Sequence, residues 1–232
     1  MKKKILIGVG VLLVLIIGVI GYFVVSDLKQ EEKLKNELDE LNLLVNEENI
    51  DVDKVKEMLN RTVTTGDYKV VETSFKEYLS DAFDSVFQIV DILNDDKLVS
   101  ILTVENYQSD GPDFIETKAY IFETKTKLEE LKNSYYSFLT EEKAMSYIEN
   151  KGLDSYYTDL YRDEYVGDMD AASEDRTVEE SINQIIELLD TSEEIINFLS
   201  TNSNSWQIED GLIIFDTKQL SNQYLDLINK LQ

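Results

Sequence analysis

The hydrophobic pattern of the chain has two parts, a continuous apolar run near the N-terminus and a helical periodicity over much of the rest. Residues 5–25 contain no charged residue, and all but five of these 21 residues are Ile, Leu, Val or Phe. A helix of this length spans about 31 Å, close to the thickness of a bilayer core. We therefore predict that residues 1–26 form an N-terminal transmembrane signal-anchor that enters the membrane through residues 5–25.

The flanks of this run indicate how it is oriented. Lys2, Lys3 and Lys4 precede it, a charged start that secretory signals and signal-anchors share. A cleaved signal has a shorter apolar core and an A-x-A-like cleavage site, and no A-x-A motif follows the run. We expect a single-pass anchor in the cell membrane, with the N-terminus in the cytoplasm and the domain that follows outside it. The alternative is a cleaved segment, which would make the protein a secreted factor.

The residues after the apolar run have the pattern of a short amphipathic helix. Leu34, Leu38, Leu41 and Val45 repeat at intervals of four, three and four, which is the spacing of a coiled-coil seam. The seam is about two heptads long, too short to indicate an oligomer. Residues 27–50 are predicted to be either a helical stalk or the first helix of a bundle.

The remainder of the chain, residues 51–232, is predicted to form one acidic helical domain, because apolar residues recur at three- and four-residue intervals. Residues 106–113 read as a loop because they contain Gly111 and the only proline. Residues 206–215 alternate like a small β-hairpin around an Asp-Gly turn. The predicted fold is mostly α, a transmembrane helix followed by a helical bundle with a small C-terminal hairpin.

Helix-capping residues predict where individual helices begin. Thr177 to Glu180 form a capping box, which places a helix start at Val178. Thr191 is expected to begin a second segment, and Asp216 is expected to cap the last helix.

Composition narrows the possible functions. The chain has 47 acidic residues against 22 Lys and Arg, a net charge of −25, and neither cysteine nor histidine. This charge repels nucleic acid and favours basic protein surfaces or cations. Thiol catalysis, serine–histidine triads and ordinary zinc sites are excluded, and paired carboxylates among so many acids arise by chance. We expect no enzyme and no cofactor, and a protein partner with a basic surface or a second copy of the chain.

Two groups of residues are candidate sites. The first is a tyrosine-rich helical face, since tyrosine combines an apolar ring with a polar tip and suits a peptide or glycan surface. Its members are Tyr156, Tyr157, Tyr161 and Tyr165. The alternative is that these tyrosines replace leucine at the rim of a helical core.

The second candidate is a cation cluster in an acidic segment, because hard cations bind carboxylate oxygens. Its members are Asp163, Asp168, Asp170 and Glu174. The order of an EF-hand loop is absent, so the alternative is an ordinary solvated loop. Taken together, the sequence predicts a membrane-anchored extracytoplasmic protein of the cell envelope that acts through protein–protein contacts. An extracytoplasmic ligand- or cation-binding module, for sensing or delivery, is the alternative.

Overall fold

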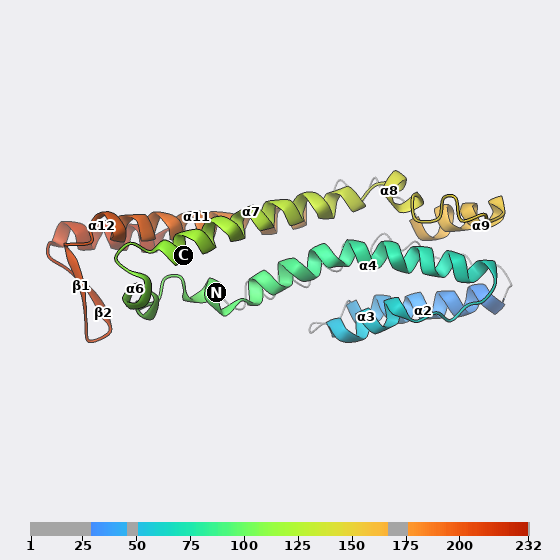
Figure 1. Ribbon diagram of the computed structural model, residues 1–232, viewed down its shortest axis with the longest axis horizontal. Coiled ribbons are helices and arrows are strands. Elements are labelled where there is room, and N and C mark those ends of the chain that lie inside the picture. The colour runs from blue at the N-terminus through green and yellow to red at the C-terminus, as the bar shows by residue number, and fades with distance from the viewer. Residues whose placement is uncertain (1–28, 46–50, 167–175, 232) are drawn as a thin grey trace. The chain divides into compact units, whose positions relative to one another are not determined.

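The computed structural model describes residues 29–45, 51–166 and 176–231, which are mostly helical with one small antiparallel sheet (Figure 1). The predicted mostly α fold with a C-terminal hairpin is confirmed for these residues. The predicted transmembrane segment lies outside them, in residues 1–28. Among the helices in the described part, none combines the length and the apolar character needed to cross a membrane.

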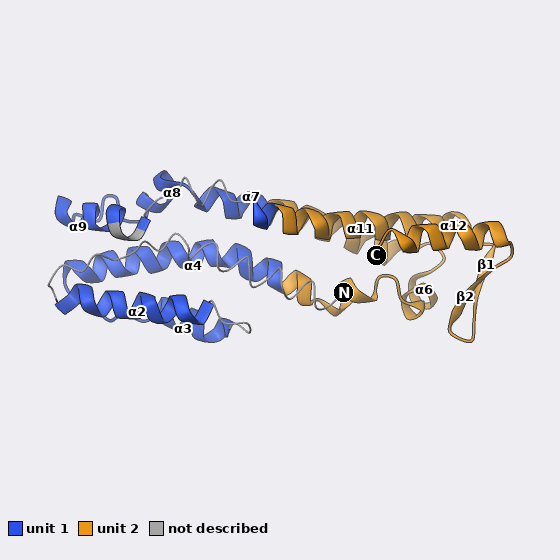
Figure 2. Cartoon of the chain, turned by 180° about the vertical axis from the view of Figure 1, so that it is seen from behind, with its two compact units in different colours: residues 1–90, 131–179 blue, residues 91–130, 180–232 orange. Residues whose placement is uncertain are grey.

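The chain forms two compact units, each built from two stretches of sequence (Figure 2). Unit 1 comprises residues 1–90 and 131–179, and unit 2 comprises residues 91–130 and 180–232. The domain boundary expected near residue 50 falls in a stretch outside the described residues, and the helices on both sides of it belong to unit 1.

Unit 1 is a bundle of helices. Its elements are α2 (Lys29–Val45), α3 (Val52–Asn60), most of α4 (Asp67–Asn94), the end of α7 (Ile115–Phe138), α8 (Glu141–Met145), α9 (Ser155–Leu160), the π-helix η1 (Tyr161–Val166) and the start of α11 (Thr177–Thr201). The four seam residues of α2 are at most 1% exposed, so this helix packs within the bundle and is not a stalk. Side chains cap the starts of α3 and α8: Asp51 accepts a hydrogen bond from Lys54 N, and Thr140 accepts one from Lys143 N.

Unit 2 contains the remaining helices and the sheet. Its elements are the end of α4, α5 (Asp96–Ser100), α6 (Val104–Asp110), the first part of α7, most of α11, β1 (Trp206–Glu209), β2 (Leu212–Phe215) and α12 (Lys218–Asn229). The hairpin pairs Trp206 with Phe215 and Glu209 with Leu212. Asp210 and Gly211 both have positive φ, 50° and 75°, as a tight two-residue hairpin turn requires.

The predicted loop over residues 106–113 is largely wrong, because α6 extends to Asp110. Thr103 caps this helix by accepting a hydrogen bond from Asn106 N at 3.3 Å. Tyr107 is 3% exposed and packs edge-on against Phe114, with ring centroids 5.9 Å apart. This one buried aromatic anchors a helix whose other residues are mostly polar.

Two predicted helix starts also differ. Helix α11 runs unbroken through Thr191, whose hydroxyl donates to the Glu187 carbonyl at 3.0 Å, a bond back to the preceding turn instead of a cap. The last helix is capped by Thr217, which accepts from Leu220 N, and not by Asp216.

Candidate interaction sites

The structure divides the four predicted surface tyrosines between core and surface. Tyr161 is 0% exposed, its hydroxyl donates to the Ala144 carbonyl at 3.0 Å, and its ring packs edge-on against Phe75. Burial raises the pKa of the Tyr161 hydroxyl. Tyr161 is therefore a core residue, and its assignment to an interaction surface is wrong. The Tyr165 side chain lies outside the described part of the chain.

The other two tyrosines lie at one end of unit 1, where the starts of α2, α4 and α9 come together (Figure 1). We call Glu31, Tyr68, Tyr156 and Tyr157 the tyrosine end. Tyr156, which is 46% exposed, donates from its hydroxyl to Glu31 Oε1 at 2.8 Å, and Tyr68 donates to the same oxygen at 2.7 Å. The Tyr157 ring packs edge-on against Tyr68 at 5.2 Å. Two phenol donors thus tie α4 and α9 to the first turn of α2.

Sequence analysis missed Glu31 and Tyr68 as members of this group. Burial, together with hydrogen bonding to Tyr156 and Glu31, raises the pKa of Tyr68. Glu31 and Tyr156 are 125 positions apart in the chain. No local spacing pattern connects residues that distant, so the sequence held no signal for the contact.

The predicted cation cluster lies mostly outside the described residues. Asp163 is exposed, whereas Asp168, Asp170 and Glu174 fall in residues 167–175. Over the ranges the structure describes, no group of three or more acidic side chains is arranged to hold a metal ion. The cation cluster stays a prediction.

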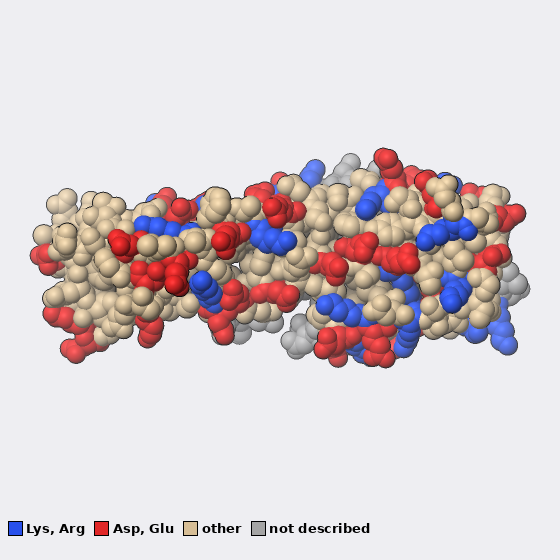
Figure 3. Space-filling view, viewed as in Figure 1, with Lys and Arg blue, Asp and Glu red and all other residues tan. Residues whose placement is uncertain are grey.

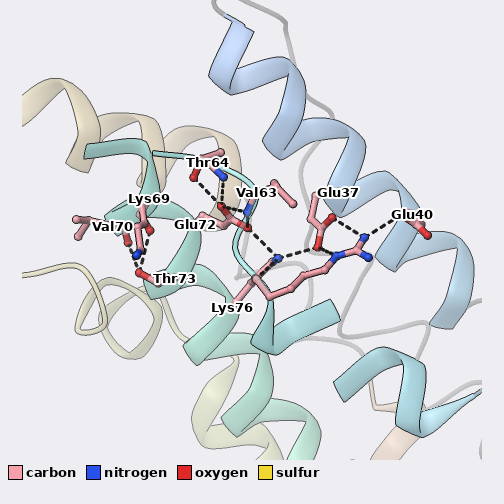
Figure 4. Close-up of polar contacts among 10 residues, drawn as sticks. Glu37, Glu40, Val63, Thr64, Lys69, Val70, Glu72, Thr73 and Lys76 are labelled. Carbon is pink, nitrogen blue, oxygen red and sulfur yellow. Dashed lines mark hydrogen bonds and ion pairs between the residues drawn. The ribbon is translucent and has the colours of Figure 1, made fainter. Parts of the chain in front are cut away.

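Unit 1 also contains a buried ion network that sequence analysis did not find. Figure 4 shows Lys76 of α4 pointing between two carboxylates, and Glu37, Glu72 and Lys76 are 5%, 0% and 2% exposed. Lys76 Nζ donates to Glu37 Oε1 at 2.8 Å, to Glu72 Oε1 at 2.9 Å and to the Arg61 carbonyl at 2.9 Å. These three bonds use all the donors of the ammonium group.

The two carboxylates fasten the segment between α3 and α4. Arg61 donates from Nε and Nη2 to the two Glu37 oxygens, each at 2.7 Å. Glu72 accepts from Val63 N, from Thr64 N at 2.8 Å and from the Thr64 hydroxyl at 2.6 Å. The network therefore joins α2, residues 61–64 and α4.

Hydrogen bonding sets the protonation of both carboxyls. Burial alone would raise the pKa of Glu37, but hydrogen bonds from Arg61 and Lys76 outweigh it, and the pKa lies below its ordinary value. Burial likewise opposes ionisation of Glu72, yet bonds from Thr64, Lys76 and the Val63 amide lower its pKa. With every donor of Lys76 already bound, the network holds α2, residues 61–64 and α4 together.

Unit 2 exposes several large apolar side chains. They are Ile115 at 72%, Phe122 at 70%, Leu212 at 64%, Leu225 at 51% and Ile214 at 41% exposed. The inner face of the hairpin packs on helices: Trp206 Nε1 donates to the Leu199 carbonyl at 2.8 Å, and the Phe215 and Tyr224 rings are 5.2 Å apart. Leu212 and Ile214 alternate with this packed face and point outward.

The unit that carries these apolar positions is strongly acidic. Residues 91–130 and 180–232 contain 19 acidic residues and 6 lysines, with no arginine. Figure 3 shows the end that carries α12 and the hairpin as largely uncharged, with acidic side chains around it. Exposed large apolar side chains on an otherwise acidic unit are a feature of protein-binding surfaces.

Comparison of the chain with protein-family models, curated proteins and solved structures found no match. The class of protein is therefore defined by its fold and surfaces alone: an acidic, two-unit helical protein. Function has to be argued from these residues and their geometry.

Proposed function

We propose that this chain is a membrane-anchored, non-enzymatic helical protein of the cell envelope that acts through contact with another protein. The observation that carries the proposal is the uncharged run over residues 5–25, which ends only three residues before α2 begins. Its length fits a bilayer core, and the lysines before it favour a cytoplasmic N-terminus. The two units would then be presented outside the cell.

The exposed apolar residues of unit 2 support a protein partner. Exposed apolar side chains on an acidic unit suit a partner that carries lysines and arginines around its own apolar centre. The net charge of −25 opposes binding of a second copy, because like charges would face each other. A basic partner is therefore the better fit.

The anchor and its orientation can be tested with single cysteines, because the chain has none of its own. Asn204→Cys places a thiol at an exposed position of unit 2, and Lys3→Cys places one before the apolar run. Treatment of intact cells with a membrane-impermeant maleimide is expected to label the first variant, at full length in the membrane fraction, and to label the second only after lysis. Labelling of the Asn204 variant only after lysis would contradict an outside domain. A shortened, labelled protein in the medium would indicate a cleaved signal.

Contact through unit 2 can be tested by photo-crosslinking. A benzoylphenylalanine at Ile214 is expected to give one adduct of defined mass, and the same group at the exposed position Gln184 of α11 is the matched control. The yield of this adduct should fall when salt is raised from about 0.1 M to about 1 M, because the Debye length falls from about 10 Å to about 3 Å and the attraction between the charged surfaces is screened. Equal yields at both positions would argue against a specific surface, and an adduct of twice the chain mass would indicate self-association.

A further inference from the structure

The tether between the apolar run and unit 1 is very short. Residues 26–28 alone separate Val25 from Lys29, the first residue of α2. A fully extended chain advances at most about 3.5 Å per residue, so Lys29 lies within about 14 Å of the end of the run. Since α2 packs within the bundle, no stalk can move unit 1 further away.

The tyrosine end lies at the start of α2, where the tether joins unit 1. Glu31 lies two residues into α2, about 3 Å along its axis from Lys29. Its carboxylate accepts hydrogen bonds from Tyr156 at 2.8 Å and from Tyr68 at 2.7 Å. The tyrosine end is thus the part of unit 1 that the tether holds nearest to the membrane.

The chemistry of this end also fits a lipid surface. The first turns of α2 and α4, with the cap of α9, carry Lys29, Lys33 and Lys69 against Glu31, Glu32, Asp67 and Asp154. This near balance contrasts with the acidic excess of the whole chain, so repulsion from headgroup phosphates is small here. Tyr156 remains 46% exposed, and tyrosine rings are enriched at membrane interfaces because they pair an apolar ring with a polar hydroxyl.

We infer that the tyrosine end faces the membrane in which the chain is anchored, and that the exposed Tyr156 ring lies among the lipid headgroups. The inference rests on the proposed anchor. It assigns α9 a role in docking unit 1 on the bilayer surface, in place of binding a soluble peptide or glycan. The tether is short, so the lipid headgroups are the surface that lies nearest to the tyrosine end. For this reason we assign the headgroups, and no soluble ligand, as its binding partner.

The test uses the full chain in phosphatidylcholine nanodiscs that contain a lipid with a nitroxide on its headgroup. A bimane fluorophore is attached to one cysteine at a time: Ser155→Cys beside the tyrosines, Gln88→Cys on an exposed position of α4, or Ser26→Cys at the end of the apolar run. Gln88 lies 20 residues after Tyr68 on α4, about 30 Å along the helix. Quenching at Ser155 is expected to exceed that at Gln88 by at least about twofold. Nitroxide quenching acts only over short distances, and the label at Gln88 lies about 30 Å further along the helix.

The Ser26 label separates two kinds of failure. If Ser26 is not quenched, the anchor does not enter the bilayer and the proposed function fails with the inference. If Ser26 is quenched but Ser155 is no more quenched than Gln88, only the membrane-facing role of the tyrosine end is overturned.

A second pair of variants tests whether the ring itself contributes. In the Ser155→Cys background, Tyr156→Ser removes the ring, and Tyr156→Phe keeps the ring but loses the hydrogen bond to Glu31. Quenching is expected to fall by about half with serine and to be retained with phenylalanine, since the apolar ring supplies most of the interfacial affinity. Equal quenching in both variants and in the Tyr156 parent would mean that the tether alone holds α9 near the lipid, and would overturn the assignment of the ring.

Discussion

Replacing Lys76 by methionine is expected to lower the free energy of unfolding by about 3–5 kcal/mol, among the largest effects of any single substitution in unit 1. The side chain keeps its length but loses the charge that lies 2.8 Å from Glu37 and 2.9 Å from Glu72. Both carboxylates would remain buried without the ammonium group between them. Urea denaturation of the full chain in detergent, followed by circular dichroism, measures the change.

The matched control for this substitution is Lys35→Met. Lys35 forms an i,i+4 ion pair with Asp39 at 2.8 Å, but its side chain is 32% exposed and that of Asp39 is 52% exposed. A surface pair of this kind contributes about 0.3–0.5 kcal/mol. If Lys76→Met costs no more than Lys35→Met, the buried network does not stabilise unit 1 in the way we describe.

The same network predicts how stability depends on pH. The pKa values of Glu37 and Glu72 lie below the ordinary value of 4.5. Their contribution to stability is therefore complete above about pH 4.5 and is lost as the pH falls through the lower folded-state values. Lys76→Met removes one of the donors that lowers both, so the difference in unfolding free energy between wild type and variant should be largest near pH 7 and shrink as the pH falls through about 4.5. A difference that grows on acidification would contradict the assignment.

Replacing Tyr161 by alanine is expected to cost about 3–5 kcal/mol, as truncation of a large buried aromatic does elsewhere. The substitution leaves a cavity beside Phe75 and removes the donor to the Ala144 carbonyl at 3.0 Å. Tyr156→Ala, five residues earlier, removes a ring that is 46% exposed and should cost about 1 kcal/mol or less. Chemical denaturation of the two variants side by side gives the comparison, and Tyr161→Phe isolates the hydrogen bond.

This pair of variants distinguishes the two interpretations of the tyrosine-rich segment. If Tyr161 belonged to a binding surface, both alanine variants would unfold at wild-type denaturant concentrations. If it belongs to the core, the Tyr161 variant shifts to much lower denaturant concentrations than the Tyr156 variant. A similar small shift for both would contradict the burial of Tyr161.

Features that depend on neighbouring residues could be predicted from the sequence. The Asp-Gly turn and the burial of the α2 seam follow from backbone preferences and helical periodicity, which act over a few residues. The prediction at Thr191 failed because its hydroxyl bonds to the Glu187 carbonyl inside one continuous helix. The prediction at Asp216 failed because more than one side chain near a helix start can cap it, and here Thr217 does so. Which one does so depends on packing around it.

Local chemistry in the sequence was therefore sufficient for the helical class and for the hairpin. The ion network and the tyrosine end were decided by tertiary structure. Lys76 meets Glu37, which is 39 positions away, and Tyr156 meets Glu31 across 125 positions. In a chain with 47 acidic residues, charge pairs are so numerous that sequence cannot select one of them. Burial in the folded structure determines which charge pair forms, because a charge removed from water is stable only beside an opposite charge.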